Sequence, residues 1–541
     1  MKKNKIIKDP IYGYVEIPIE YVSDIIDTAV FQRLRRIVQT SYSPLYSSAV
    51  HNRFVHSIGV YYLGKIATRY LLDGINSLNE INDKEIFKSY GKIFEIACLL
   101  HDVGHAPFSH TGEEFYLDEK KGYEKLHEML EKLVNIDKFS DDIPKNGASA
   151  AAPHEIMSAV IGLKEFEKFF SNNSEKEFFA RCITGYEYSD KKKENSVKNC
   201  FIKMLNSEII DVDKLDYLIR DAYITGFDTV SIDFIRLLSS IRVISENEEV
   251  KIAYSKSAIS IIENVVYAHD AEKKWIQSHP VVLYESYVIK HIISYLNEKV
   301  NKDDKKLFSL ESLGLNGQEL KDNLRISLLC DDDIIFLMKN KFSNELSKEY
   351  FERKERRHPV WKSEAEYKSL ILRKVSAGNL LDKFEEAMNQ TANYLMKNTG
   401  TWVIDNKLIE KLENENKKVK NDTNLDIKTK ETQLKSKEKI LKILHSLQEY
   451  ANENQIECNF VILTAKQFYS GFGKADFSRI NIIFRTKNEN KIEKFGEIVS
   501  SLEAKDKTRN NFFYLFYKRP KDNNIELDSE DICNKLIKKF I

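Results

Sequence analysis

Three histidines fall within ten residues, His101, His105 and His110, and Asp102 directly follows the first of them. The apolar segment before them, residues 93–100, predicts a buried helix that delivers the His101–Asp102 pair into the interior. A buried carboxylate is costly unless something pairs with it. Imidazole and carboxylate are both good ligands for Zn, Mn or Fe, so a divalent metal is one candidate partner. The alternative is a helix end with a capping aspartate and packed histidines.

Two other segments offer side chains of the same kinds. His56 lies in the run His-Asn-Arg-Phe-Val-His-Ser that starts at residue 51, and residues 211–221 hold four aspartates and two basic residues. An isolated charged helix would place such residues in solvent as ion pairs. Apolar residues between the charges instead indicate a face turned into a site. Helical spacing places four polar side chains of this segment on one face: Asp213, Lys214, Tyr217 and Asp221.

The elements that position these residues are predicted to be mainly helical. Residues 6–18 alternate around a glycine turn and predict a small N-terminal β-hairpin. Near the C-terminus the period becomes two, which predicts strands over 459–463, 480–484 and 512–517. The expected fold class is therefore mainly α, an all-helical core with the hairpin and a smaller C-terminal α+β unit. Helical periodicity predicts helices over 19–36, 53–75, 85–101, 154–172, 207–223, 231–240, 257–300, 331–350 and 363–397.

Composition sets the broad class. The 541 residues carry no formal net charge, with 42% hydrophobic and 31% charged residues, which is typical of a globular protein without a global pull toward nucleic acid or membrane. The six cysteines are scattered and no apolar run approaches a membrane span, so we expect free thiols and a cytoplasmic protein. We expect a core over 1–400 with its motifs in 50–225, a charged helical linker over 401–450, and the α+β unit over 451–541.

The order His56, His101-Asp102, Asp213 resembles the signature of HD-domain metal phosphohydrolases. Three motifs are similar, more closely, to those of the deoxynucleoside triphosphate triphosphohydrolases: His-Asn-Arg-Phe-x-His-Ser, His-Asp-x-Gly-His-x-Pro-Phe-Ser-His and Asp-Val-Asp-Lys-x-Asp-Tyr. The resemblance covers roughly residues 5–300 and weakens beyond. It implies hydrolysis of a deoxynucleoside triphosphate to deoxynucleoside and inorganic triphosphate.

The resemblance also implies a role for each residue of the site. The metal, Mn, Fe, Mg or Zn, would help to generate a hydroxide beside the α-phosphate. Thr40 stands where the family usually has an apolar residue, which leaves selectivity for deoxyribose over ribose open. The metal ligands would be His56, His101, Asp102 and Asp213. The catalytic group would be His105, His110, Glu113 and His154. The substrate would contact Gln39, Arg53, Lys214, Tyr217, Asp221 and, more weakly matched, Tyr284.

A second set of residues matches an activator site of regulated family members. There an aspartate accepts from a guanine edge while lysine and arginine hold phosphates, so GTP or dGTP is the implied activator. The basic run at 352–358 resembles an element that joins this site across a subunit interface, and the family implies a homo-oligomer, a tetramer or hexamer. Packing of an amphipathic helix is the alternative explanation. The matched residues are Lys5, Asp27, Gln32 and Arg35.

Two other functions compete with the triphosphohydrolase. The cyclic-dinucleotide and nuclease branches of the superfamily typically carry lysine where this chain has His105, which disfavours a phosphodiesterase or nuclease. A nucleotide-sensing or nucleic-acid-binding scaffold finds support only in the lysine-rich residues 406–439, which otherwise predict a solvated helix or linker. Nucleic-acid binding is therefore at most a secondary property.

Overall fold

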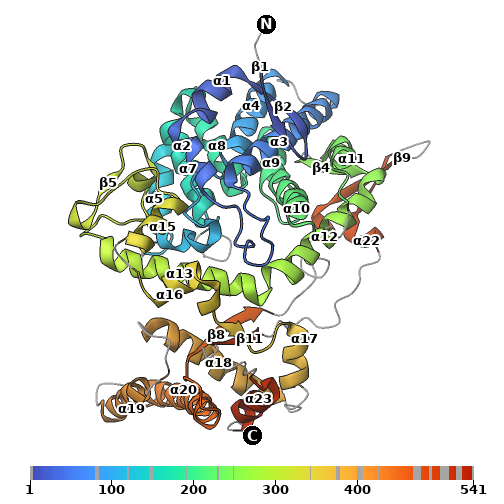
Figure 1. The fold of residues 1–541 in the computed structure, drawn as a ribbon. Coiled ribbons are helices and arrows are strands. Elements are labelled where there is room, and N and C mark those ends of the chain that lie inside the picture. Colours follow the sequence, from blue (N-terminus) through green and yellow to red (C-terminus); the bar gives the residue numbers. More distant parts are fainter. Residues whose placement is uncertain are drawn as a thin grey trace. The chain divides into compact units, whose positions relative to one another are not determined.

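A computed structural model describes residues 4–78, 84–117, 121–144, 151–190, 192–227, 231–247, 249–340, 343–372, 378–398, 404, 406–422, 426–466, 477–485, 490–499, 511–518 and 527–538. The chain forms two compact units (Figure 1). Unit 1 contains residues 1–273, 289–343 and 470–504, and unit 2 contains residues 274–288, 344–469 and 505–541. The chain thus passes between the two units more than once.

The core of unit 1 is a bundle around α3, Arg53–Ser77 (Figure 1). Asn52 begins this helix, because its side chain accepts a hydrogen bond from the Val55 amide. α3 packs against α4, Lys84–Leu100, and against α10, Val212–Thr225. α7, Pro153–Glu165, packs against α8, Asn173–Thr184, which also contacts α4. These helices bring the three predicted motif segments into one core.

Shorter helices complete unit 1. They are α1 Ile19–Tyr21, α2 Ala29–Gln32, α5 Glu124–Val134, α6 Asp137–Asp142, α9 Lys193–Leu205, α11 Phe234–Ser239, α12 Ile259–Glu272, α14 Leu310–Leu313, α15 Asp331–Asn340 and α22 Phe495–Ile498. α13, Pro280–Val300, contributes its first residues to unit 2 and residues 289–300 to unit 1.

Among its described residues, unit 1 also contains three β-sheets. β1, Asn4–Asp9, and β2, Gly13–Pro18, form the predicted antiparallel hairpin, with Lys5 opposite Ile17. A four-stranded sheet has the order β10-β9-β4-β3, in which β4 and β9 run parallel. Its strands are β3 Ile241–Glu246, β4 Glu249–Ser255, β9 Asn481–Arg485 and β10 Asn490–Lys494. The third sheet pairs β5 Gln318–Glu319 with β6 Arg325–Ile326.

Unit 2 is built from helices and a three-stranded sheet. The sheet has the order β7-β11-β8, and β11 pairs antiparallel with both neighbours. Its strands are β7 His358–Pro359, β8 Phe460–Lys466 and β11 Asn511–Tyr517, and the helices are α16 Glu345–Phe351, α17 Glu364–Tyr367, α18 Gly378–Asn398, α19 Asn406–Asn421, α20 Ile427–Glu453 and α23 Ser529–Lys538.

The mainly helical fold class, the N-terminal hairpin and the C-terminal strands are confirmed. Several predicted helices are shorter than expected: the helix over 257–300 is interrupted before Pro280, which begins α13, and that over 331–350 is interrupted before Asn344, which caps α16. The hairpin of β3 and β4 fills the gap between the helices expected over 231–240 and 257–300, where no element was predicted, although Ile241, Val243 and Ile252 offer the alternation of a strand.

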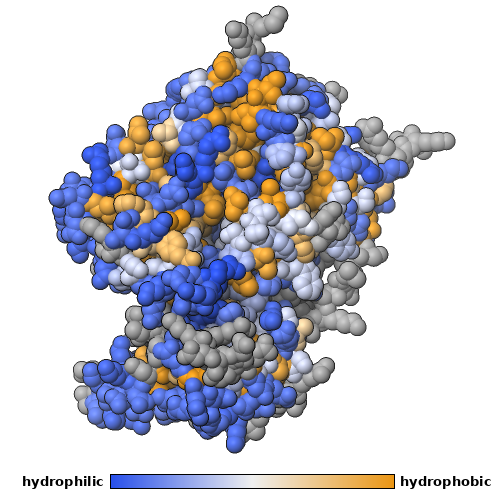
Figure 2. Space-filling view, in the orientation of Figure 1, coloured by the Kyte–Doolittle hydropathy of each residue, from blue (hydrophilic) through white to orange (hydrophobic). Residues whose placement is uncertain are grey.

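The surface of unit 1 in Figure 2 mixes hydrophilic with hydrophobic residues, and the hairpin leaves Ile6 and Tyr14 largely exposed. None of the described helices is both long and apolar enough to cross a membrane. All six cysteines lie in described segments and are free thiols, as predicted.

Candidate active site

The first group of the site joins the three predicted motif segments. α3 supplies His56, the end of α4 leads into His101 and Asp102, and the first turn of α10 supplies Asp213. The Nε2 atoms of His56 and His101 lie 3.2 Å apart. Asp213 Oδ1 lies 2.9 Å from His56 Nε2 and 3.4 Å from His101 Nε2. Asp102 lies 3.5 Å from each Nε2 atom, through Oδ2 to His56 and through Oδ1 to His101. Both Nε2 atoms therefore lie within 3.5 Å of both carboxylates, and His56, His101 and Asp102 are close enough to hold one metal ion.

The opposite edge of each imidazole is fixed by a hydrogen bond. His56 Nδ1 lies 2.7 Å from Asp216 Oδ2, and His101 Nδ1 lies 2.9 Å from the Cys98 carbonyl oxygen. Such partners fix the tautomer that leaves Nε2 free for a metal. Burial acts against a charge on His56, but the carboxylates of Asp213 and Asp216 outweigh it and raise its pKa to about 10. The surroundings thus favour a cation at this point, which fits a divalent metal.

Asp216 belongs to a buried network that the sequence analysis did not single out. Arg220 donates from Nε and Nη2 to the two oxygens of Asp216, at 2.9 and 3.0 Å, and from Nη1 to Asp9 at 3.0 Å. Tyr12, in the turn of the β1–β2 hairpin, donates its hydroxyl to Asp216 at 2.7 Å. The N-terminal hairpin is thereby tied to His56. The spacing of Asp216 and Arg220, four residues apart on α10, is a signal in the sequence that could have indicated this pair.

The second group contains three histidines and one glutamate. His105 and His154 stack with ring centroids 3.9 Å apart, and His110 lies edge-on to both rings at 5.1 Å. Glu113 binds His110 Nδ1 at 3.3 Å through one oxygen and His154 Nδ1 through the other. The four residues predicted as a catalytic group are therefore brought together, and Glu113 partners two of the histidines.

Electrostatics give these histidines different protonation states. Burial, together with Arg53 and His154, lowers the pKa of His105 well below its usual value. Burial also opposes a charge on His154, but Glu113 prevails and raises the pKa of His154. The two shifts therefore favour the neutral form of His105 and the protonated form of His154. His105 Nε2 lies 3.2 Å from Asp102 Oδ1, so Asp102 stands between the two groups.

The loop from His101 to His110 is held in an unusual conformation. A Cβ on Gly104 would lie 2.3 Å from the Ser158 amide nitrogen, so glycine lets the loop approach α7 closely. Phe108 and Ser109 adopt left-handed φ angles of 57° and 54°. Asp331 accepts from the Phe108 amide at 2.7 Å and from the Val38 amide at 2.9 Å, which ties the loop to the segment before Gln39.

Arg33 holds the same loop from another side. Its guanidinium is buried and donates to three carbonyl oxygens, those of Val103 at 2.7 Å, His105 at 3.0 Å and Leu329 at 2.8 Å. Asp331 and Arg33 were not predicted, because contacts between residues some 300 positions apart leave no periodic signal in a single sequence.

The predicted phosphate-binding residues lie at the edge of the first group. Arg53 is buried and donates to Asp102 at 2.8 Å, Ser109 at 2.9 Å and the Gln39 carbonyl at 3.2 Å. Lys214 donates to Asp211 at 2.7 Å and to the Ser207 carbonyl at 2.6 Å. Arg53 thus contacts the metal-group residue Asp102, and Lys214 directly follows the metal-group residue Asp213 in the chain. Phosphate binding by these two cations stays a prediction.

The predicted sugar-binding residues form a second edge. Asp221 lies 2.7 Å from His51 Nε2, and the His51 carbonyl accepts from the Gln39 amide at 2.9 Å. Gln39 Oε1, Thr40 Oγ1 and His51 Nδ1 are buried and have no hydrogen-bond partner among the described residues. Buried polar atoms are rarely left unpaired, so they indicate a place for a ligand with hydroxyl groups.

Two predicted substrate contacts differ in their surroundings. Tyr217 is half-buried on α10, one turn beyond Asp213. Tyr284 belongs to unit 2, where it is fully buried and donates its hydroxyl to Glu349 at 2.6 Å. Tyr284 and the other predicted site residues thus belong to different units, and its contact with substrate stays a prediction.

The four predicted activator residues form two contacting pairs in unit 1. Lys5 Nζ lies 3.8 Å from Asp27, and Arg35 donates to Gln32 Oε1 at 2.8 Å. Gln32 in turn donates to the carbonyl of Ile26, the neighbour of Asp27, at 2.7 Å. Activator binding at this cluster stays a prediction.

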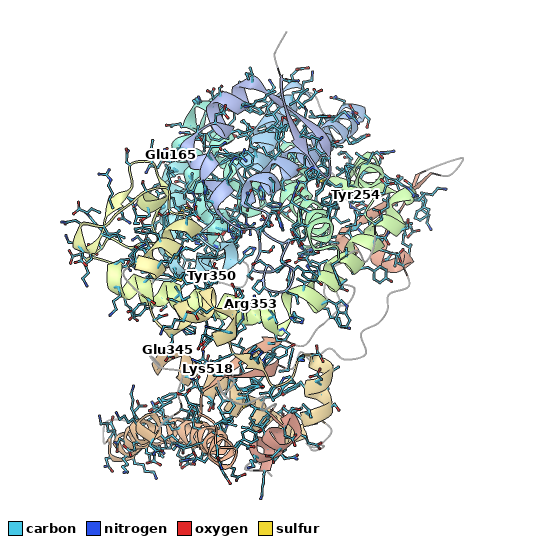
Figure 3. The ribbon with its side chains drawn as sticks, in the orientation of Figure 1. Glu165, Tyr254, Glu345, Tyr350, Arg353 and Lys518 are labelled. Atoms are coloured by element: carbon cyan, nitrogen blue, oxygen red, sulfur yellow. The ribbon has the colours of Figure 1, made fainter. Side chains whose placement is uncertain are left out.

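A cavity of about 590 Å³ lies elsewhere in unit 1, lined by residues that include Glu155, Asn206 and Tyr254, the last on β4 (Figure 3). Among its described lining residues is none of the predicted site residues. Glu155, which neighbours His154 in sequence, accepts from the Ala152 amide and from Asn206.

Comparison with known proteins agrees with this geometry. Residues 53–194 match the family model described as HD domain. The chain is 34% identical over 249 residues to the deoxynucleoside triphosphate triphosphohydrolase SAMHD1 homolog of Dictyostelium discoideum, covering 45% of this chain and 41% of that protein. It is 32% identical to SAMHD1 of Danio rerio, covering 44% and 36%. It is 28% identical to the uncharacterized protein YwfO of Bacillus subtilis, covering 54% and 56%. The chain thus spans about half the length of the curated relatives it matches.

Proposed function

From the premise that this chain carries an HD domain and is similar over about half its length to deoxynucleoside triphosphate triphosphohydrolases, we propose that it hydrolyses a deoxynucleoside triphosphate to deoxynucleoside and inorganic triphosphate. One observation supports this most directly. Asp102, a member of the four-residue metal group, also contacts a histidine group in which the pKa of one imidazole is lowered and that of another is raised. A bound metal, a general base and a general acid are the components of metal-assisted hydrolysis of a phosphate ester.

The chain's own residues account for the proton movements. His56, His101, Asp102 and Asp213 would hold a divalent metal, which polarises the phosphate when bound. His105 is neutral and buried, so it can accept a proton from the attacking water. Glu113 raises the pKa of His154 and so favours its protonated form, which can give a proton to the 5′-oxygen as the phosphorus–oxygen bond breaks.

Positioning comes from the two edges of the site. Arg53 and Lys214 lie where phosphate oxygens would accept from their remaining N–H groups. Gln39, His51 and Asp221 would hold the sugar hydroxyls. These hydroxyls would give hydrogen-bond partners to the unpaired atoms Gln39 Oε1 and His51 Nδ1. A ribose would bring its 2′-hydroxyl near the same edge, where Thr40 has an unpaired hydroxyl group, so the substrate panel has to include ribonucleotides.

The test is a substrate panel. Purified protein is incubated with each deoxynucleoside triphosphate and each ribonucleoside triphosphate in the presence of Mn²⁺. Inorganic triphosphate is the expected product, and its loss in Asp102→Ala together with loss of bound metal would tie it to this site. Release of pyrophosphate or monophosphate alone would refute the assignment, and cleavage of cyclic or oligonucleotides would favour a phosphodiesterase.

Activation by a guanine nucleotide is the regulatory part of the proposal. It is supported by the pairs Lys5–Asp27 and Arg35–Gln32, of which the second also reaches the backbone beside Asp27. GTP or dGTP should raise the rate, and Arg35→Ala should reduce that stimulation. Full activity without either nucleotide would contradict it. Assembly into a tetramer or hexamer stays a prediction. Light scattering on the same protein samples would measure the number of subunits.

A further inference from the structure

The histidine group has unused metal-binding capacity. His105 is fully buried. Its Nδ1 has no hydrogen-bond partner among the described residues, and its Nε2 faces Asp102 Oδ1 at 3.2 Å without a well-aligned hydrogen bond. The ligand nitrogens of His105, His110 and His154 all lie within 4.8 Å of one another. A buried imidazole with an unpaired ring nitrogen is rare, and it indicates that a ligand normally completes this group.

Glu113 prepares the other two rings in the way a carboxylate does at a zinc centre. It binds Nδ1 of His110 and Nδ1 of His154, which leaves the Nε2 atom of each ring free. In carboxylate–histidine–zinc arrangements the same outer carboxylate fixes the ring and raises the basicity of the ligating nitrogen. Here one carboxylate does this for two histidines at once.

We propose that His105, His110 and His154 form a second metal site, selective for Zn²⁺, beside the group of His56, His101, Asp102 and Asp213. A donor set of three imidazoles suits zinc, whereas Mn²⁺ and Mg²⁺ prefer oxygen ligands. The first group has two carboxylates and accepts both kinds of ion. The second site is therefore distinguished by its metal preference as well as by its residues.

The geometry needs a small closure. Zinc–nitrogen bonds of about 2.0–2.1 Å in a tetrahedral site place two ligand nitrogens about 3.3 Å apart. The group must contract by up to about 1.5 Å to reach this distance. His110 can supply the movement, because its side chain is 65% exposed on a short turn at Ser109–Thr111.

Zinc at this site would occupy the nitrogens that the proposed reaction needs for proton transfer. The two uses exclude each other, so the second ion should inhibit. In protein loaded with Mn²⁺ at the first group, added Zn²⁺ should lower the rate of nucleotide hydrolysis. This consequence rests on the proposed function, whereas metal binding does not.

The experiment counts metal ions without substrate. Metal-free full-length protein is dialysed against Zn²⁺ or Mn²⁺ and the bound metal is measured by elemental analysis. Wild type should hold two equivalents of zinc and one of manganese. Asp213→Ala should lose the first zinc and keep the second, while His110→Gln and His154→Gln should each lose the second and keep the first.

His127→Gln is the matched control, since His127 lies on α5 and contacts Tyr186 instead of the site. It should keep both zinc ions. His110→Gln guards against misfolding, because His110 is the most exposed member of the group. A single zinc in wild type that is lost in Asp213→Ala and kept in His154→Gln would overturn the second site and leave the proposed hydrolase intact. Two zinc ions in a protein without hydrolase activity would refute only the hydrolase.

Discussion

At the scale of single residues, the side chains behind the metal group are as informative as the ligands. Asp216 Oδ2 accepts from His56 Nδ1 and Arg220 Nε, and Oδ1 accepts from Tyr12 and Arg220 Nη2. All four acceptor positions of a buried carboxylate are thus in use. This saturation explains how a carboxylate with no exposure stays ionised, with its pKa lowered against burial by Arg220 and His56.

Asp216→Asn should weaken metal binding without removing a ligand. The amide keeps the volume but replaces an acceptor oxygen with a donor, so His56 loses a well-defined tautomer. Outer-shell substitutions of this kind typically reduce metal affinity about 10- to 100-fold. Competition for the metal with a chromogenic chelator measures this affinity. Tyr12→Phe removes one hydrogen bond to the same carboxylate and should give a smaller loss; equal affinity in Asp216→Asn and wild type would contradict the argument.

Glu95 on α4 predicts a pH dependence of stability that is separate from the site. Burial raises its pKa to about 7, only partly offset by Lys65 and Lys92, and the phenols of Tyr21 and Tyr61 lie within its field. Because the folded-state pKa is above the unfolded value, its contribution is present below about pH 4.5 and is lost as the pH rises through about 7. The folded state is thus destabilised at higher pH.

Glu95→Gln should therefore stabilise the protein at pH 8, by about 2 kcal/mol, and have little effect at pH 5. Thermal melting of both proteins at the two pH values measures the difference. Glu85→Gln on the same helix is the control, since Glu85 is largely exposed beside Lys88 and should change the melting temperature little at either pH. A stabilisation that is the same at both pH values would show that Glu95 is not the titrating group.

At the scale of elements, the first residue of α15 helps to hold the loop from His101 to His110 in place. Phe108 and Ser109 have left-handed backbone angles that cost non-glycine residues about 1 kcal/mol each or more. Asp331 bonds the Phe108 amide, and Ser109 donates its hydroxyl to the Val38 carbonyl. The unfavourable angles are thus maintained by contacts from two other parts of unit 1.

Asp331→Asn should loosen this loop while leaving the metal group loaded. The amide can accept from only one of the two N–H groups that now face the carboxylate, so one buried donor is left unpaired at a cost of about 1–3 kcal/mol. We expect a lower melting temperature and a lower kcat with unchanged metal content. Asp332→Asn is the control, because its exposed ion pair with Arg36 is worth less than about 1 kcal/mol. Loss of metal in Asp331→Asn would indicate a different role.

The sequence was sufficient for elements whose signal is local. The helices α3, α4 and α10 have clear periodicity, and their motif residues meet as the spacing predicts. Contacts between residues far apart in the sequence could not be predicted. The hydrogen bonds of Asp331 with Phe108 and of Tyr12 with Asp216 each join single residues more than 200 positions apart. Neither leaves a repeat or a pattern in one sequence. The site could therefore be predicted better than the supports that position it.

At the scale of the whole molecule, unit 1 is not a contiguous stretch of chain. β9 lies more than 200 residues beyond β4, yet the two pair in parallel, with Tyr254 opposite Ile482. Asn481 donates its side-chain amide to the Ile252 carbonyl at 3.0 Å, and Ile482 is fully buried. A C-terminal strand is thus part of the unit that carries the site.

A chain that ends after Lys466 should have a destabilised unit 1, even though every predicted site residue remains. Loss of β9 leaves the β4 edge without its partner and uncovers apolar residues such as Tyr254. Amide hydrogen exchange should be faster over 249–255 than in the full chain. A chain that ends after Lys518 removes α23 but keeps β9, and it should retain the protection of β4. Equal protection in the two shortened chains would mean that β9 contributes little to unit 1, and that its sheet is held by β3 and the helices alone.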